Sequence, residues 1–203
     1  MKYLKRGFTL VELLIVMGLL GAIAMIVIAA INPIEQTNRA RDTRFKADGS
    51  QLISAIDRYF AARSEFPWVT VDDVTYTNEF SYGFVSASDE GVGICGADCT
   101  VDGVLLTSEE LKTEFRNRDF IKKYSATDPS KNIYIGKSTS AAGSIYACFI
   151  PAAKSTKKNA ITDGKVYRLA DDGTKEETTV CDLDTAVWTG SGIADSCFVC
   201  IPE

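Results

Sequence analysis

The sequence has no histidine, and this absence excludes several classes of enzyme. Ser-His-Asp and Cys-His nucleophiles, histidine general bases and histidine metal sites all require that residue. The chain also has no excess of positive charge, because 22 Lys and Arg residues stand against 27 Asp and Glu residues and give a net charge of −5. A constitutive nucleic-acid surface needs clustered Lys and Arg, so nucleic acid is not an expected partner.

Charged residues are nearly absent from one long stretch near the N-terminus. From Phe8 to Ile31 the side chains are aliphatic or aromatic, apart from Thr9, Glu12 and two glycines. As a helix this run reaches roughly 36 Å, and a hydrocarbon core is about 30 Å thick. The segment 8–31 is therefore predicted to cross a membrane.

The residues before this run resemble an export signal with one difference. Lys2, Lys5 and Arg6 are positive, as at the start of a secretory signal. A secretory signal has an apolar core of about 7–15 residues, and its small-residue cleavage site follows that core. Here the small residue, Gly7, precedes the core. Cleavage after Gly7 would keep the apolar segment as the N-terminus of the mature chain.

The run Lys-Arg-Gly-Phe-Thr-Leu-Val-Glu-Leu at positions 5–13 resembles the cleavage and methylation motif of type IV pilins and type II secretion pseudopilins. The resemblance implies that an integral-membrane prepilin peptidase cuts between Gly7 and Phe8 and N-methylates Phe8. It implies a single-pass precursor in the inner, cytoplasmic membrane. It also implies a pilus assembly ATPase, a platform protein and self-association into a helical filament at the cell surface.

Glu12 is the one formal charge inside the apolar run. A carboxylate at membrane depth is costly unless it is paired. The resemblance implies that Glu12 pairs with the N-terminal amine of a neighbouring subunit and so fixes the axial register of the assembly. The alternative is a glutamate near the helix start that reaches the lipid headgroups.

Pro33 ends the apolar run and is predicted to kink or unwind the helix, because proline removes a backbone donor. Helical periodicity then resumes over 32–63 and indicates an amphipathic second half. Its predicted core-facing residues are Phe45, Leu52, Ile53, Ile56, Tyr59 and Phe60. Four basic residues on this half are expected either to meet carboxylates of neighbouring subunits or anionic headgroups, or to form a solvated face. They are Arg39, Arg41, Arg44 and Lys46.

The remaining residues, 64–203, are expected to form a globular extracytoplasmic unit. Val69–Val104 is interpreted as a loop region, and Thr107 with Glu110 resembles a capping box that opens a helix ending near Tyr124. The core-facing residues predicted for that helix are Leu111, Phe115, Phe120 and Ile121. Five later segments are rich in β-formers and predict an antiparallel sheet. They are Asn132–Gly136, Ser144–Ile150, Lys165–Leu169, Glu176–Cys181 and Cys197–Ile201, with Asp172-Gly173 as a turn between the third and fourth.

These segments predict an α+β fold in which the amphipathic helix covers a small antiparallel sheet. The resemblance implies the type IV pilin-like version of that fold, with one long N-terminal helix whose first half is transmembrane. The expected divisions are a leader at 1–7, a transmembrane and polymerisation helix at 8–31, its amphipathic continuation at 32–63 and the globular unit at 64–203.

All six cysteines follow the membrane segment, and an even number in an extracytoplasmic unit indicates disulfides. Cys95 and Cys99 are expected to pair across a small loop, and Cys181 with Cys197 or Cys200. Cys148 then pairs with the remaining one. The last two cysteines should have different partners, because residues three apart on a strand point to opposite faces. A four-cysteine zinc site is the alternative.

Two sets of charged residues suggest alternative ligands, namely calcium for a set of aspartates and DNA for a set of lysines. Asp182 and Asp184 belong to a set of C-terminal aspartates, and pseudopilins that this chain resembles bind calcium in a C-terminal loop. No EF-hand spacing is present, so neither a metal nor a cofactor is expected. Lys154, Lys157 and Lys158 form a basic loop, for which contact with DNA is the alternative to a solvated surface.

The expected function is structural, with no catalytic residue assigned. The chain is expected to be a subunit of a type IV pilus or pilus-like filament. A type II secretion pseudopilin and a minor pilin are alternatives within the same family. The alternative of another class is a membrane-anchored extracytoplasmic binding protein or enzyme, which would need a catalytic or ligand-binding constellation that the sequence does not display.

Overall fold

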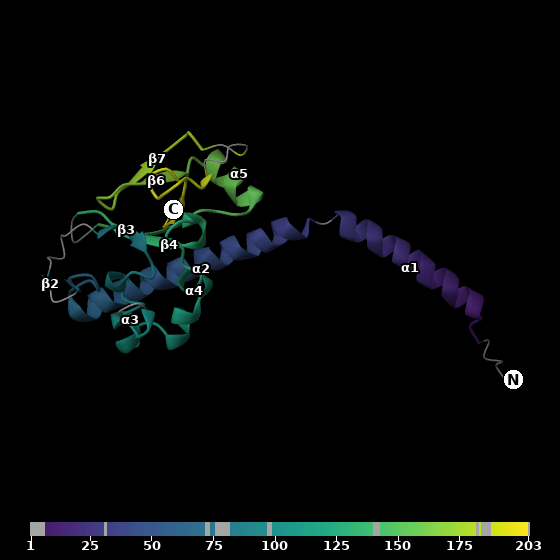
Figure 1. Cartoon of the computed structure of the whole chain (residues 1–203), viewed down its shortest axis with the longest axis horizontal. Coiled ribbons are helices and arrows are strands. Elements are labelled where there is room, and N and C mark those ends of the chain that lie inside the picture. The colour runs from purple at the N-terminus through teal and green to yellow at the C-terminus, as the bar shows by residue number, and fades with distance from the viewer. Residues whose placement is uncertain are drawn as a thin grey trace. The chain divides into compact units, whose positions relative to one another are not determined.

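The computed structural model describes residues 7–30, 32–71, 74–75, 82–96, 99–139, 143–181, 183 and 188–202. The chain divides into two compact units, Met1–Thr37 and Asn38–Glu203. Helix α1 (Leu10–Ala30) belongs to the first unit. Helix α2 (Pro33–Arg63) begins in the first unit and continues as the main helix of the second (Figure 1).

One face of α2 is buried along most of its length, as the helical spacing of its apolar residues predicts. The buried residues are Asp42, Phe45, Asp48, Gly49, Leu52, Ala55, Ile56 and Tyr59. The prediction of core-facing residues is confirmed, with Ile53 and Phe60 half-buried against the same core. Helix α2 ends where Ser64 adopts a left-handed conformation with φ of 59°.

The main sheet has four antiparallel strands in the order β3-β4-β5-β8. Their bounds are β3 Tyr82–Ser86, β4 Ile133–Lys137, β5 Ile145–Phe149 and β8 Val199–Ile201. In the register of the central strands, Ile135 lies opposite Ala147, and Cys148 lies opposite Cys200. The strands predicted around 132–136, 144–150 and 197–201 are therefore confirmed, each with slightly different ends.

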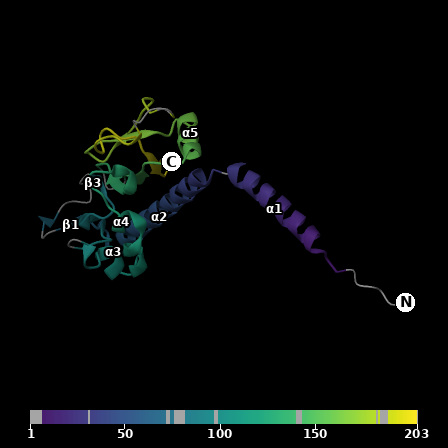
Figure 2. The same ribbon diagram turned by 45° about the vertical axis from the view of Figure 1, so that its right-hand side comes forward.

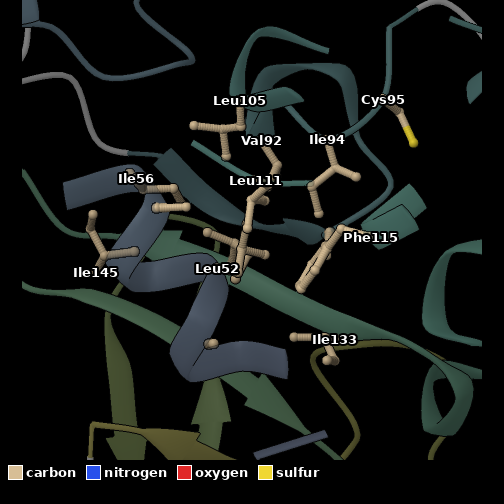
Figure 3. Packing of buried hydrophobic residues seen from close by; sticks show 14 of the residues in the cluster. Leu52, Ile56, Val92, Ile94, Cys95, Leu105, Leu111, Phe115, Ile133 and Ile145 are labelled. Atoms are coloured by element: carbon tan, nitrogen blue, oxygen red, sulfur yellow. The ribbon is translucent and has the colours of Figure 1, made fainter. Parts of the chain in front are cut away.

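Both faces of this sheet are buried, so side chains alternate between two hydrophobic clusters. Ile133 and Ile135 face the first cluster, which contains the buried face of α2, whereas Tyr134 between them faces the second. Figure 3 shows the first cluster, in which Leu52 and Ile56 of α2 lie among residues from the strands and from the segment before them. The helix covers one face of the sheet, as predicted.

The C-terminal part of the chain covers the other face. It contains helix α5 (Lys154–Thr162) and the hairpin of β6 (Tyr167–Leu169) and β7 (Lys175–Glu177). In both views the main sheet lies between α2 and this second layer (Figures 1 and 2). The predicted Asp172-Gly173 turn joins β6 and β7. Gly173 is required there because its φ is 78° and a Cβ would meet the carbonyl oxygen of Lys137.

Shorter elements complete the described structure. They are β1 (Thr70–Val71) paired with β2 (Val74–Thr75), the 3-10 helices η1 (Glu90–Val92), η3 (Thr113–Asn117) and η4 (Pro129–Lys131), and the single helical turns α3 (Val104–Thr107) and α4 (Asp119–Lys122).

The predicted helix from Thr107 to Tyr124 is wrong. Thr107 ends the short helix α3, and its hydroxyl donates to the carbonyl oxygens of Gly103 and Val104 instead of capping a following turn. Glu109 then adopts a positive φ of 62°, which interrupts any helix. The apolar residues of this segment nevertheless reach the core as predicted, and they are Leu111, Phe115, Phe120 and Ile121.

Two elements were not predicted. Strand β3 lies within 69–104, where the sequence predicts a loop, and α5 contains Lys154, Lys157 and Lys158, for which the sequence predicts a basic loop. The N-cap residue of α5, Ala153, has no capping side chain of its own. Instead, the buried Asp42 of α2 accepts hydrogen bonds from the backbone N–H groups of Ala152 and Ala153, both at 2.9 Å. This cap comes from a residue 110 positions away, which no local pattern reveals.

Asp48, the second buried carboxylate of α2, is only partly compensated. Its Oδ1 lies 3.6 Å from Nε of Arg118, whose side chain is 41% exposed. Burial raises the pKa of Asp48, and the charge of Arg118 opposes that rise. The folded state therefore disfavours the ionised carboxylate relative to the unfolded chain.

Gly49 permits close contact between α2 and the sheet. A Cβ at this position would lie 3.1 Å from Cβ of Ala147 and 3.4 Å from Cδ1 of Ile201. We expect Gly49→Val to lower the free energy of unfolding by about 1–3 kcal/mol, because the added carbons overpack this contact. Urea unfolding of the full chain in detergent micelles measures the change. Ser50→Val, on the exposed side of the same helix, is the control, and equal losses in both variants would contradict the close contact.

A second prediction concerns pH. Because the pKa of Asp48 is raised on folding, its contribution to stability is present below the unfolded pKa and is lost as the pH rises through the folded pKa. Asp48→Asn should therefore be more stable than the wild type near pH 7, because the amide does not carry the charge that burial disfavours. The difference should fade in acid, where both side chains are neutral.

Asp172 provides a control for which the expected pH dependence of stability has the opposite sign. Hydrogen bonds from Thr174 lower the pKa of Asp172, so its contribution is present above the unfolded pKa and is lost as the pH falls. Asp172→Asn should lower stability near pH 7. Urea midpoints of both variants at several pH values test the two signs. A loss of stability near pH 7 in Asp48→Asn would contradict the first prediction.

Candidate processing and assembly site

The predicted cleavage site lies immediately before the first helix. Gly7 and Phe8 are exposed and are not helical, and α1 begins at Leu10. Lys2, Lys5 and Arg6 of the leader lie outside the described residues. The Gly7–Phe8 peptide bond is therefore in non-helical chain at the end of the described structure.

Thr9 and Glu12 form a reciprocal cap that defines this helix start. The backbone N–H and the hydroxyl of Thr9 donate to Oε2 of Glu12 at 2.9 and 2.8 Å. The backbone N–H of Glu12 donates back to the Thr9 hydroxyl oxygen at 3.3 Å. This is a capping box, and the Thr-x-x-Glu spacing at 9–12 is the sequence signal that identifies it.

The capping box gives the Glu12 carboxylate a partner within its own chain. The two side chains satisfy the backbone N–H groups of Thr9 and Glu12 and also bond to each other, so the carboxylate is hydrogen-bonded before any other subunit is present. Its pairing with the N-terminal amine of a neighbouring subunit stays a prediction. Such pairing would exchange the hydrogen bonds with Thr9 for a charge pair.

The apolar side chains of α1 are exposed along its whole described length. Phe8 is 77% exposed, and none of the large apolar residues of α1 is less than 47% exposed. The segment Leu10–Ile28 has a mean hydropathy of 2.7, and it is the one helix in the described part of the chain that is long and apolar enough to cross a membrane. Gly18 and Gly21 add positions where another helix could approach closely, because nothing lies within 4 Å of a Cβ built there.

The helical run is interrupted at the position that the proline predicts. Helix α1 ends at Ala30, and α2 begins at Pro33. Oδ1 of Asn32 accepts a hydrogen bond from the backbone N–H of Glu35 at 3.2 Å, so Asn32 acts as the N-cap of α2. Proline is favoured at the next position because it has no N–H group to leave unsatisfied.

Arg41 and Arg44, two of the basic residues after the break, have identified partners within the chain. Nη2 of Arg41 donates to the carbonyl oxygens of Ser130 and Ile150 at 2.7 and 2.8 Å. Nη1 of Arg44 lies 3.4 Å from Oδ2 of Asp119. The expectation that all four serve only neighbouring subunits, headgroups or solvent is therefore corrected for Arg41, which anchors α2 to the strand layer.

The six cysteines form three disulfides, and these join Cys95 to Cys99, Cys148 to Cys200, and Cys181 to Cys197. This is one of the two arrangements that the sequence left open. Strand periodicity does not explain why Cys197 and Cys200 have different partners. Cys197 precedes β8, which begins at Val199, and both cysteines lie in the second hydrophobic cluster. The partner of Cys200 is decided by register, since it lies directly opposite Cys148.

The zinc and calcium alternatives concern the cysteines and the C-terminal aspartates. A four-cysteine zinc site needs thiolates, whereas the structure joins all six cysteines in disulfides. Asp182 and Asp184, the calcium candidates, lie outside the described residues. Among the residues that are described, no three Cys, Asp or Glu side chains are grouped closely enough to hold a metal ion.

The disulfides close loops of very different length, which leads to a prediction. In the chain-entropy description, removing the Cys148–Cys200 bond, with a sequence separation of 52, should lower the free energy of unfolding by about 4 kcal/mol. Removing Cys95–Cys99, with a separation of 4, should cost about 2 kcal/mol. Urea unfolding of the two double-alanine variants compares them, and a larger loss for the short loop would contradict the loop-length argument.

Comparison with known proteins identifies the N-terminal motif. Residues 3–29 match the prokaryotic N-terminal methylation motif, which is the signal motif of type IV pilins and pseudopilins. No curated protein and no solved structure matches the chain. The match covers the end of the leader and most of α1, and the α+β globular unit that follows is consistent with a pilin-like fold. The chain thus carries the N-terminal signal of a type IV pilin-like or pseudopilin precursor.

Proposed function

We propose that the chain is a structural subunit of a type IV pilus or pilus-like filament. It is made as a precursor, cut after Gly7, N-methylated on Phe8 and assembled through α1. One observation carries the proposal: the residues that match the methylation motif lie in a membrane-length helix whose large apolar side chains are exposed in the part of the chain that the structure describes.

The mechanism is assembly. In the precursor, lipid surrounds the apolar side chains of α1. In the filament, the α1 helices of other subunits replace lipid, and packing at small residues such as Gly18 and Gly21 contributes to their association. Cleavage frees the amine of Phe8 about one helical turn from Glu12. A helix displaced along its neighbour would leave that amine and carboxylate unpaired in apolar surroundings, so the pair selects one register.

The proposed partners follow from this route. They are an integral-membrane prepilin peptidase, an assembly ATPase, a platform protein and further pilin subunits. The precursor resides in the cytoplasmic membrane as a single-pass protein, and the product is an extracellular filament at the cell surface. The role is structural, and it requires neither a cofactor nor catalytic residues.

The methylation motif equally supports a second candidate, because pseudopilins carry the same signal. A pseudopilin or minor pilin would use the same processing and the same helix but would be a rarer or shorter-lived part of a filament. The abundance of the processed chain in surface filaments separates these candidates. A membrane-anchored binding protein or enzyme is the alternative of another class, and it would not need Glu12 for its placement.

The decisive measurement is mass spectrometry of sheared surface filaments. We expect an abundant N-terminal peptide that starts at Phe8 and carries one N-methyl group, because cleavage and methylation act at this residue. Gly7→Val should retain the leader and remain in the membrane fraction. Glu12→Ala should reach the membrane yet form no filaments. An uncut Met1 start in the wild type, or normal filaments with Glu12→Ala, would overturn the proposal.

A further inference from the structure

A small, positively charged pocket lies between α2 and the residues that follow α4. Its volume is about 140 Å³. Its lining residues are Arg41, Phe45, Asp119, Lys123, Ser130 and Lys131. Three cations therefore surround it with a single carboxylate, although the chain as a whole has a net charge of −5. The ribbons of α2 and α4 lie next to each other here in both views (Figures 1 and 2).

Arg41 is held in place before any ligand binds. Its Nη2 group donates to the carbonyl oxygens of Ser130 and Ile150, and its guanidinium lies 4.7 Å from the ring centroid of Phe45. Within the described part of the chain, no acceptor takes the remaining Nη1 and Nε donors. A fixed guanidinium with free donors loses little conformational entropy when it binds an anion.

The two lysines of the pocket are paired, but only at the surface. Lys123 lies 3.4 Å from Oδ1 of Asp119, and Lys131 lies 3.1 Å from Oδ2 of Asp128. Their side chains are 67% and 53% exposed, and ion pairs of this kind contribute little. Both ammonium groups are therefore able to turn toward an anion in the pocket without a large loss.

The carboxylates near the pocket are compensated. Asp119 is shared between Lys123 and Arg44, which lies 3.4 Å from its other oxygen. The carboxylate of Asp42, adjacent to Arg41 in sequence, accepts its two backbone hydrogen bonds at the start of α5. Counting Arg44, Asp42 and Asp128 with the lining residues, four cations face three carboxylates, so the local charge is positive.

We propose that this pocket binds a phosphoryl anion. A planar guanidinium fork and two mobile ammonium groups match the oxygens of a phosphate group. Pockets for drug-sized ligands are about 300–1,000 Å³, so this smaller pocket suits a single small group. Two sources share the chemistry, namely free phosphate and the headgroup of an anionic phospholipid.

The proposal that a lipid headgroup is the ligand rests on the proposed function, because it requires a membrane-anchored chain. The proposal that the pocket binds an anion does not rest on it. Arg41 lies eight residues after Pro33 on α2, which is roughly 12 Å along the helix axis. A precursor anchored by the preceding helix would keep this pocket within reach of the membrane surface.

The test uses the full-length, uncut chain in zwitterionic detergent micelles, with sodium phosphate titrated against sodium chloride of equal ionic strength. We expect saturable NMR shifts of the Nε–Hε signal of Arg41 and of the backbone amides of Phe45 and Lys131. The double variant Lys123→Gln/Lys131→Gln should bind about tenfold more weakly, because two charge-assisted contacts are lost. This variant retains Arg41 and its anchoring hydrogen bonds.

The control variant, Lys154→Gln/Lys158→Gln, removes the same charge from α5 and should bind phosphate normally. Equal weakening in the two variants, or shifts in phosphate no larger than those in chloride, would overturn the proposal. The result is independent of processing, so phosphate binding together with an uncut Met1 start in cells refutes only the proposed function. A normal methylated Phe8 peptide without phosphate binding refutes only the pocket.

Nanodiscs distinguish the two sources. If headgroups occupy the pocket, the Arg41 signal should shift in nanodiscs that contain phosphatidylglycerol and stay unchanged in pure phosphatidylcholine, without added phosphate. If free phosphate is the ligand, the signal should respond to orthophosphate in both nanodiscs and not to phosphatidylglycerol. A signal that responds to neither would contradict anion binding in the membrane-inserted chain.

Discussion

Two consecutive residues of α2 determine how the globular unit is assembled around that helix. Arg41 donates to carbonyl oxygens that precede β4 and follow β5, and Asp42 accepts from the first backbone N–H groups at the start of α5. Buried charged groups that lose their partners cost several kcal/mol, so α2 cannot slide by one residue without losing these bonds together. The close contact at Gly49 fixes the same register two turns later. Helix, sheet and second layer therefore depend on one short polar segment.

The parts of the fold that the sequence predicts are those with a strong local signal. The length of its apolar run predicts α1, helical spacing predicts the buried face of α2, and the content of β-formers predicts β4 and β5. The parts that it missed depend on distant residues. Helix α5 has no apolar stripe, and its cap comes from Asp42. Thr107 and Glu110 match a capping box by spacing, yet the helical turn that contains the buried Leu105 and Leu106 ends at Thr107 instead of beginning there.

The candidate site also has parts that the sequence predicts and parts that depend on distant residues. Gly7, Phe8 and Glu12 were predicted from a contiguous motif, and the break at Pro33 follows from the chemistry of proline. The disulfide partner of Cys181 could not be chosen from spacing, because register across β5 and β8 decides it. The anchoring role of Arg41 was also beyond the sequence, since its acceptors lie about 90 and 110 residues away.

The distribution of exposed apolar residues indicates where the driving force for assembly lies. Among the described residues, sixteen exposed large apolar side chains lie between Phe8 and Ile34. The rest of the described chain has five, which are Val101, Val104, Tyr124, Val180 and Leu183. The sheet of the globular unit has no bare apolar face, because α2 covers one side and the C-terminal layer covers the other. In the proposed assembly, apolar association between copies would therefore come mainly from α1, and contacts between globular units would be left to polar and charged groups, which salt weakens.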